Sequence, residues 1–272
     1  MTELLAPAKL NLALVVGPKR PDGKHEVATV LQALDLADRV SLAPAQRLRV
    51  SGFADDTLVE RALRLLARRA GVEPRFEARI TKRIPVAAGL GGGSSDAATA
   101  LRLANETLER PLGPDALEAL GRELGVDVPF FLAPGPKLGE GDGTSLTPLD
   151  LPQDYWVAVV APRTERKPST RAVYEAFDAR GGPDGFEERR AALLEALRRV
   201  RRPRDLAALP PNDLASSPVA AELLGLGAFR ADVTGAGPAV YGLFAHRSAA
   251  RAAVARLRAV GRVWVTVPSW YV

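Results

Sequence analysis

The sequence predicts an α+β protein built from two domains, and three observations support that prediction. Strand-like alternation and helix-like apolar stripes are interspersed in both halves of the chain. A glycine-rich segment between a predicted strand and a predicted helix dominates the first half. Residues 134–154 are rich in Pro, Gly and Asp, which is typical of a domain boundary. We therefore expect an N-terminal domain over residues 1–150 and a C-terminal domain over residues 151–272.

The first predicted strand spans residues 8–16. Lys9 and Asn11 project from one face of it, about 7 Å apart along the strand. The other face is expected to hold five apolar side chains, those of Ala8, Leu10, Leu12, Leu14 and Val16. A surface lysine and an edge-strand asparagine are the ordinary alternatives for the two polar residues. A turn follows at residues 18–23, and apolar character resumes over 27–36.

The glycine-rich segment, residues 85–96, is the most informative part of the chain. Alternation over 76–84 predicts a strand before it, and an apolar stripe predicts a helix after it, with Ser94, Ser95 or Asp96 as N-cap. Glycine admits close approach of the backbone, and the first N–H groups of a helix favour an anion. We expect a phosphate here, with a bare turn as the alternative.

Two common phosphate motifs do not fit this segment. It lacks the Lys-Ser/Thr pair that ends a P-loop, and Ser94 stands where the Rossmann fingerprint has its third glycine. The hydroxyls of Ser94 or Ser95 are candidates for contacts with phosphate oxygens or with Mg²⁺. The segment is therefore predicted to be a phosphate loop of another kind.

The remaining elements alternate in type along the chain. Helices are expected over 57–69, ended by Gly71, and over 115–124, ended by Gly125. The second half is expected to contain strands at 156–160, 233–244 (two short strands around a glycine turn) and 263–267, and helices at 169–177, 185–200 and 248–260. This half is predicted to be a small α+β sandwich.

Composition excludes several classes of protein. The chain has no cysteine and only two histidines, which excludes disulfides, thiolate chemistry and a multi-histidine metal centre. No apolar run reaches a membrane span and the N-terminus does not read as a signal peptide, so we expect a cytoplasmic protein. The net charge of +5 suits anionic ligands, but the arginines at 198–202 are interpreted as a solvated helix face. With 6% aromatic residues, nucleic-acid binding is not favoured.

Lys9 and Asp127 are the best candidates for chemistry on a phosphate. Asp127 is a carboxylate among apolar residues, and a helix N-cap is its ordinary alternative. If the two met in space, the ammonium would keep the carboxylate ionised and neutralise charge on a transferred phosphoryl group. His25 after the first turn and the glycine turn at 234–237 are weaker candidates. A loop histidine and a β-hairpin are their alternatives.

Three ordered segments resemble the motifs of the GHMP kinases. They are residues 85–95, which read Pro-Val-Ala-Ala-Gly-Leu-Gly-Gly-Gly-Ser-Ser, residues 7–12, and residues 234–237. The resemblance implies a first domain like domain 2 of ribosomal protein S5, a ferredoxin-like second domain, and ATP on the glycine loop. The implied ATP-binding residues are Lys82, Pro85, Val86, Ala87, Ala88, Gly89, Leu90, Gly91, Gly92, Gly93, Ser94 and Ser95, and Gly235 and Gly237 form a possible phosphate or substrate loop.

Four segments are similar to one branch of that family: residues 20–25, 88–98, 125–131 and 212–214. The branch phosphorylates the 2-hydroxyl of a cytidine diphosphate-linked methylerythritol with ATP, in the non-mevalonate route to isoprenoids. The resemblance implies Asp127 as catalytic base with Lys9 beside it. It implies substrate binding by Asn11, His25, Thr170 and Tyr174, with His25 at the cytosine edge and Tyr174 stacked on the ring. ATP as donor and Mg²⁺ are the expected cofactors.

One position departs from that branch, because Lys24 stands where an aromatic residue is usual. A lysine offers no π-face, although its stem can cover a ring and its ammonium can meet a phosphate. The sequence is also compatible with two other functions. One is a mevalonate-pathway or homoserine-type kinase, and the other is a non-catalytic basic RNA-binding protein with an S5-like domain. The expected partners are small molecules, with no nucleic acid or membrane, and the protein is expected to be a monomer or a homodimer.

Overall fold

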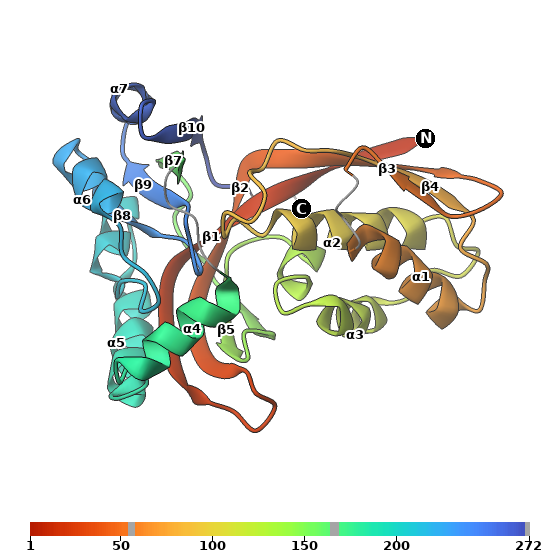
Figure 1. Ribbon diagram of the computed structural model, residues 1–272, viewed down its shortest axis with the longest axis horizontal. Helices are drawn as coiled ribbons and strands as arrows, with labels where there is room; N and C mark the ends of the chain where they lie inside the picture. Colours follow the sequence, from red (N-terminus) through yellow and green to blue (C-terminus); the bar gives the residue numbers. More distant parts are fainter. Residues whose placement is uncertain (54–57, 164–168, 270–272) are drawn as a thin grey trace.

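The computed structural model describes residues 1–53, 58–163 and 169–269, and the described chain forms two β-sheets with helices packed on them (Figure 1). The first sheet has the order β3-β4-β2-β5-β6, with β1 paired to β2. Its strands are β1 (Thr2–Lys19), β2 (His25–Pro44), β3 (Arg49–Ser51), β4 (Phe76–Thr81), β5 (Lys137–Gly141) and β6 (Ser145–Pro148). Helices of the same half are α1 (Leu58–Ala70), α2 (Gly92–Asn105), α3 (Pro114–Leu124) and the short η1 (Pro129–Leu132).

The second sheet is antiparallel throughout, in the order β10-β7-β9-β8. Its strands are β7 (Trp156–Pro162), β8 (Arg230–Val233), β9 (Val240–Phe244) and β10 (Gly261–Thr266). The accompanying helices are α4 (Thr170–Ala179), α5 (Phe186–Arg199), η2 (Pro203–Ala208), α6 (Pro218–Gly225) and α7 (Arg247–Leu257). The mixture of helices and strands in both halves confirms the predicted α+β class.

The first strand is twice as long as predicted, and the face of the sheet to which its alternate side chains point changes part-way along. The register with β2 shifts between Asn11 and Ala13. A bulge of this kind inserts a residue and reverses which face later side chains occupy. Leu14 and Val16 therefore do not join the core that holds Leu10 but pack in a separate cluster near α4. The prediction that they share a face with Leu10 was wrong for that reason.

Helix α2 begins earlier than the side-chain pattern indicated. Its N-cap is Gly91, which has φ 70°, so Ser94, Ser95 and Asp96 lie inside the first turns and none of them is the N-cap. Because glycine adopts this left-handed conformation without steric cost, the loop can turn into a helix without a capping side chain. The prediction of a serine or aspartate cap was wrong.

The segment at 134–154 is more ordered than a linker. It contains the β5–β6 hairpin, and β5 pairs with β2. This segment therefore completes the first sheet, and the chain passes to the second sheet between Pro148 and Trp156. We propose that the domain boundary lies near residue 150, where this passage occurs.

The other predicted elements are close to their expected positions. Helix α1 ends before Gly71, which has φ 69° as expected, whereas the predicted start at Thr57 lies outside the described residues. Gly125 ends α3 as predicted, and its backbone there is extended, with φ 169°. Sequence reasoning missed β3, β5, β6, η2 and α6, which are short. Within the described residues, no helix has both the length and the apolar composition that crossing a membrane requires.

The two sheets share a hydrophobic core, and this contact positions the site. Leu10 and Leu12 of β1 pack in one buried cluster with Tyr241 and Leu243 of β9. The Tyr241 hydroxyl donates to the carbonyl oxygen of Leu12 at 3.1 Å. In Figure 1 the β1–β2 ribbon runs from the first sheet to the side of α4 and α5. Strand β1 is therefore the element against which both halves are aligned.

Candidate active site

Lys9 is buried at the junction of the two halves and bonded to polar partners. Its side chain is 5% exposed, and its Nζ donates to Asn11 Oδ1 at 2.7 Å and lies 3.7 Å from Asp127 Oδ2. The backbone N–H of Lys9 donates to the carbonyl oxygen of Leu90, in the glycine-rich loop, at 2.9 Å. A buried ammonium requires such compensation, because burial without a partner is costly. The alternative of an ordinary surface lysine is therefore wrong.

Asn11 lies in a small buried network beside Lys9. Its Nδ2 donates to Thr29 Oγ1 at 2.8 Å, and its backbone N–H donates to Thr234 Oγ1 at 3.1 Å. The network fixes the amide so that Oδ1 faces the ammonium of Lys9. Sequence reasoning missed Thr29, which lies eighteen residues away on the paired strand and carries no local signal.

Asp127 lies between the end of α3 and the start of η1. The N-cap position of η1 is Val128, and no side-chain cap bond is made there, so the N-cap alternative for Asp127 is wrong. The Asp127 side chain is 38% exposed, which leaves its carboxylate accessible to a ligand while it pairs with Lys9. The predicted meeting of these two residues is present in the structure.

The glycine-rich loop encloses a cavity of about 330 Å³ at the N-terminus of α2. All of the loop residues from Pro85 to Ser94 line it, together with Phe53, Leu58 and Lys82. Ser95 is different: its side chain is fully buried, and its Oγ has no hydrogen-bond partner among the residues that the structure describes. Of the two serines considered for Mg²⁺, only Ser94 lines the cavity.

Two glycines of the loop are required by close contacts as well as by backbone conformation. Gly89 has φ 85°, and a Cβ there would lie 2.4 Å from the carbonyl oxygen of Thr234. Gly91 has φ 70°, and a Cβ there would lie 2.9 Å from Lys9 Cγ. The loop therefore packs directly against Lys9 and against the 234–237 turn of the second half.

The 234–237 turn joins β8 to β9, so it is a hairpin connection that also reaches the site. The amide of Asn212 fixes it, donating to the carbonyl oxygens of Val233 at 2.9 Å and Gly235 at 2.7 Å. A Cβ on Gly235 would lie 3.6 Å from Lys9 Nζ. The hairpin alternative and the site prediction are therefore compatible at Gly235. Gly237 packs against the glycine-rich loop instead, since a Cβ on Gly89 would lie 3.2 Å from its carbonyl oxygen.

Lys82 lies at the edge of the glycine-loop cavity with two buried carboxylates. Its Nζ donates to Asp38 Oδ2 at 2.6 Å and to Asp96 Oδ2 at 2.7 Å, and both carboxylates are fully buried. Burial lowers the pKa of the Lys82 ammonium, but Asp96 and Asp38 outweigh it, and the net pKa is raised. The ammonium is thus a fixed positive charge beside the loop. A contact with ATP remains a prediction.

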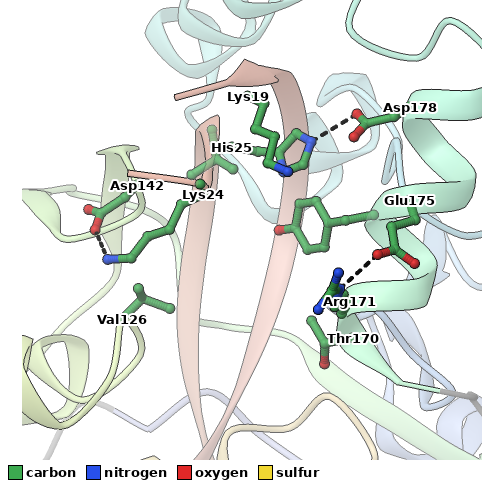
Figure 2. Close-up of a pocket in the computed structure, with 12 residues that line it drawn as sticks. Lys19, Lys24, His25, Val126, Asp142, Thr170, Arg171, Glu175 and Asp178 are labelled. Carbon is green, nitrogen blue, oxygen red and sulfur yellow. Dashed lines mark hydrogen bonds and ion pairs between the residues drawn. The ribbon is translucent and has the colours of Figure 1, made fainter. Parts of the chain in front are cut away.

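A second cavity, of about 570 Å³, lies between the tip of the β1–β2 ribbon and α4 (Figure 2). The His25 and Tyr174 rings line it with centroids 4.8 Å apart, and His25 Nε2 lies 2.8 Å from Asp178 Oδ1. Burial and the charge of Asp127 raise the pKa of Tyr174 to about 12, so its phenol stays neutral. Thr170 and Lys24 also line this cavity.

A smaller cavity of about 190 Å³ connects the other two. It shares Gly89 and Gly91 with the glycine-loop cavity and Thr170 and Tyr174 with the cavity at α4. Lys9, Asn11 and Asp127 line this connecting cavity, with Gly235. The charged pair therefore lies between a phosphate-type loop and a pocket with an aromatic wall.

Family models match both halves of the chain. The model described as the GHMP kinases N terminal domain matches residues 57–135, and the model described as GHMP kinases C terminal matches residues 194–263. The fold and the three connected cavities agree with these matches. Together they define a small-molecule kinase of the GHMP class.

Individual relatives identify one family within this class. A protein from Anaeromyxobacter sp. (strain Fw109-5) named 4-diphosphocytidyl-2-C-methyl-D-erythritol kinase is 41% identical over 91% of this chain and 84% of its own. A protein of the same name from Geobacter sp. (strain M21) is 38% identical over 94% of each chain. A crystal structure of 4-(cytidine 5'-diphospho)-2C-methyl-D-erythritol kinase is similar with a TM-score of 0.81 and 36% identity, covering 98% of this chain and 99% of that one. The chain belongs to the 4-diphosphocytidyl-2-C-methyl-D-erythritol kinase family of GHMP kinases.

Proposed function

We propose that this protein transfers the γ-phosphoryl group of ATP to the 2-hydroxyl of 4-diphosphocytidyl-2-C-methyl-D-erythritol. The observation that carries the proposal is the order of the three connected cavities. The glycine loop lies at one end, the Lys9–Asp127 pair in the middle and the His25–Tyr174 pocket at the other end. This order suits a donor, a reacting hydroxyl and a nucleobase in one line.

In this proposal the triphosphate lies on the glycine loop. Helix α2 begins at this cavity, where the N–H groups of its first turn and the positive end of its dipole favour negative charge. Residues 85–95 and Lys82 would contact ATP in this arrangement. The buried Ser95 would then act through packing, while Ser94 supplies a hydroxyl to the cavity.

Asp127 would accept or orient the proton of the substrate hydroxyl, and Lys9 would neutralise charge on the transferred phosphoryl group. Since Lys9 is already fixed by Asn11 and by the backbone, little reorganisation is needed in the transition state. Phosphoryl transfer usually passes through a loose transition state, so positioning contributes more than activation of the nucleophile.

Mg²⁺ belongs to the proposal as a partner of the ATP phosphates. Among residues 1–53, 58–163 and 169–269, no three His, Cys, Asp or Glu side chains gather into a metal site. Magnesium commonly binds through one or two protein groups plus substrate phosphates, and such a site does not require a protein cage. Ser94 is the residue that would hold it, and the ion would neutralise phosphate charge there.

The test is turnover of three alcohols with ATP: the cytidylyl substrate, mevalonate and homoserine. We expect kcat/KM for the cytidylyl substrate to exceed the others by about 100-fold or more. Phosphorus NMR of the product should show a new phosphate monoester on the methylerythritol unit. Preference for mevalonate or homoserine would contradict the proposal. Steeply salt-dependent RNA binding without ATP consumption would do so as well.

A further inference from the structure

The cavity at α4 has two unlike walls. Figure 2 shows Thr170, Arg171 and Glu175 of α4 on one side, and Lys24 with Asp142 on the other. Tyr174, between Arg171 and Glu175 in the same helix, gives the α4 wall an aromatic ring. The facing wall is formed by an ion pair instead of a second ring.

Lys24 is held at both ends. Its backbone N–H donates to Asp22 Oδ1 at 3.0 Å, and its carbonyl oxygen accepts from the Arg20 N–H at 2.7 Å. At the other end, Nζ donates to Asp142 Oδ2 at 2.5 Å. The methylene stem therefore spans from the tip of the β1–β2 ribbon to the β5–β6 turn, along the edge of the cavity.

Asp142 is itself a fixed anchor. Its Oδ1 accepts from the Thr144 N–H at 3.1 Å and from Thr144 Oγ1 at 2.6 Å, which leaves Oδ2 for Lys24. Burial raises the pKa of Asp142, but its bonds with Lys24 and Thr144 outweigh burial and lower it to about 2. The carboxylate is therefore ionised throughout the neutral pH range, and the ion pair persists.

We propose that the stem of Lys24 is the second wall of the nucleobase site, covering the face of the pyrimidine opposite Tyr174, and that Asp142 is the positioning residue that holds the stem there. This inference rests on the proposed function, because it concerns the base of the cytidylyl substrate. Lysine stems cover apolar surface while the charged head stays at a polar partner. Because Asp142 already satisfies the ammonium, Lys24 contributes coverage of the ring more than attraction for phosphate.

The experiment compares Lys24→Ala, Lys24→Met, Lys24→Tyr and Asp142→Asn in steady-state kinetics with the cytidylyl substrate and ATP. Removal of the stem in Lys24→Ala should raise the substrate KM about tenfold, since covering the base with about two methylene groups is worth a factor of this order. Lys24→Met keeps the stem without its anchor and Asp142→Asn weakens the anchor, so each should raise the KM by only about threefold. Lys24→Tyr replaces the stem by an aromatic ring and should keep the substrate KM near the wild-type value. The KM for ATP and kcat should stay within about twofold in all four variants.

The double variant Lys24→Ala/Asp142→Asn separates positioning from a structural role. If Asp142 acts only through Lys24, the second change should add nothing to the first. A rise in the substrate KM below about threefold for Lys24→Ala would overturn the proposal that the stem forms a wall. An equal rise in KM for Lys24→Ala and Lys24→Met would overturn it as well, because the effect would then come from the charge of Lys24. Failure of the proposed function is visible separately, as absence of wild-type turnover of the cytidylyl substrate, and would overturn both proposals.

Discussion

Lys9 Nζ lies 3.7 Å from Asp127 Oδ2 although the two residues are 118 positions apart in the chain. Lys9 is fixed on β1 by the amide of Asn11, and Asp127 stands in the short connection between α3 and η1. The pair lines the cavity between the glycine loop and the pocket at α4.

Asp127→Asn should lower kcat by about 100- to 1,000-fold, because the amide cannot accept the hydroxyl proton. The KM values for ATP and for the alcohol should change little. Steady-state kinetics would show the split. Asp115→Asn, at an exposed position of α3, is the matched control and should behave like the wild type. Near-normal kcat in Asp127→Asn would refute its assignment as base.

Lys9→Met should also lower kcat by about 100-fold or more, because a fixed positive charge is lost at the transferred group. Residues that act as a unit are not additive, so Lys9→Met/Asp127→Asn should be barely slower than the worse single variant. The measurement is a double-mutant cycle in kcat, with circular dichroism to establish folding. Strict additivity of the two losses would show that the residues act independently.

Gly89→Ala should destabilise the protein, whereas Gly93→Ala should not. The first change places a Cβ against the carbonyl oxygen of Thr234 at a positive φ. The second lies in α2, and no atom of the described residues is within 4 Å of the added Cβ. Alanine in place of a helical glycine stabilises by about 0.5–1 kcal/mol, so the two variants should differ in sign. Urea denaturation of both variants would test this, and equal losses would contradict the role of Gly89 in close packing.

Lys82→Met should lower the free energy of unfolding by about 3–5 kcal/mol, because two buried carboxylates lose their cation. Neutralising one of them in Lys82→Met/Asp38→Asn should recover part of that loss. Both carboxylates are fully buried, so solvent screening is weak. Denaturant unfolding of the two variants and of Asp38→Asn alone completes the cycle. A double variant less stable than Lys82→Met would contradict the ion-pair account.

Lys137 should give stability a measurable pH dependence. Its buried Nζ bonds to the carbonyl oxygens of Phe130, Ala133, Pro134 and Gly135. Burial lowers the pKa of Lys137 to about 8, whereas its ordinary value of 10.5 applies in the unfolded chain. Between these two pH values Lys137 is therefore protonated in the unfolded chain and neutral in the folded protein. Stability then rises with pH across this window and the contribution is lowest below pH 8.

Tyrosines also titrate at high pH, so the contribution of Lys137 is measured as the difference in unfolding free energy between wild type and Lys137→Met. It should grow in favour of the wild type from pH 8 to 9.5 in urea titrations. A difference that stays constant would show that the ammonium remains charged in the folded protein over this range.

Local patterns were sufficient to identify much of the site. Lys9 and Asn11 are two residues apart on a strand, so period-two alternation alone puts them on one face. The glycines at 89 and 91 were recognisable because few other residues adopt their backbone conformations. Both predictions depend on neighbours in the chain, which is the range over which sequence patterns carry information.

Long-range contacts were not predictable in this way. The bulge after Asn11 reversed the facing of Leu14 and Val16, and it depends on pairing with β2. Thr29 and Asp38 are polar residues within long apolar strands, and their partners are distant in sequence. The sequence pattern alone gave no reason to single them out.

By itself, the sequence determined the α+β class, the glycine loop and the polar face of β1, because strand periodicity and glycine conformations are local properties. Only the tertiary structure decided that Asp127 meets Lys9, that Lys82 is held by two buried carboxylates, and that Lys24 pairs with Asp142. These contacts follow from the packing of the shared core around β1 and from the pairing of β2 with β4 and β5. Packing and pairing bring together charged groups whose separation along the chain says nothing about their distance in space.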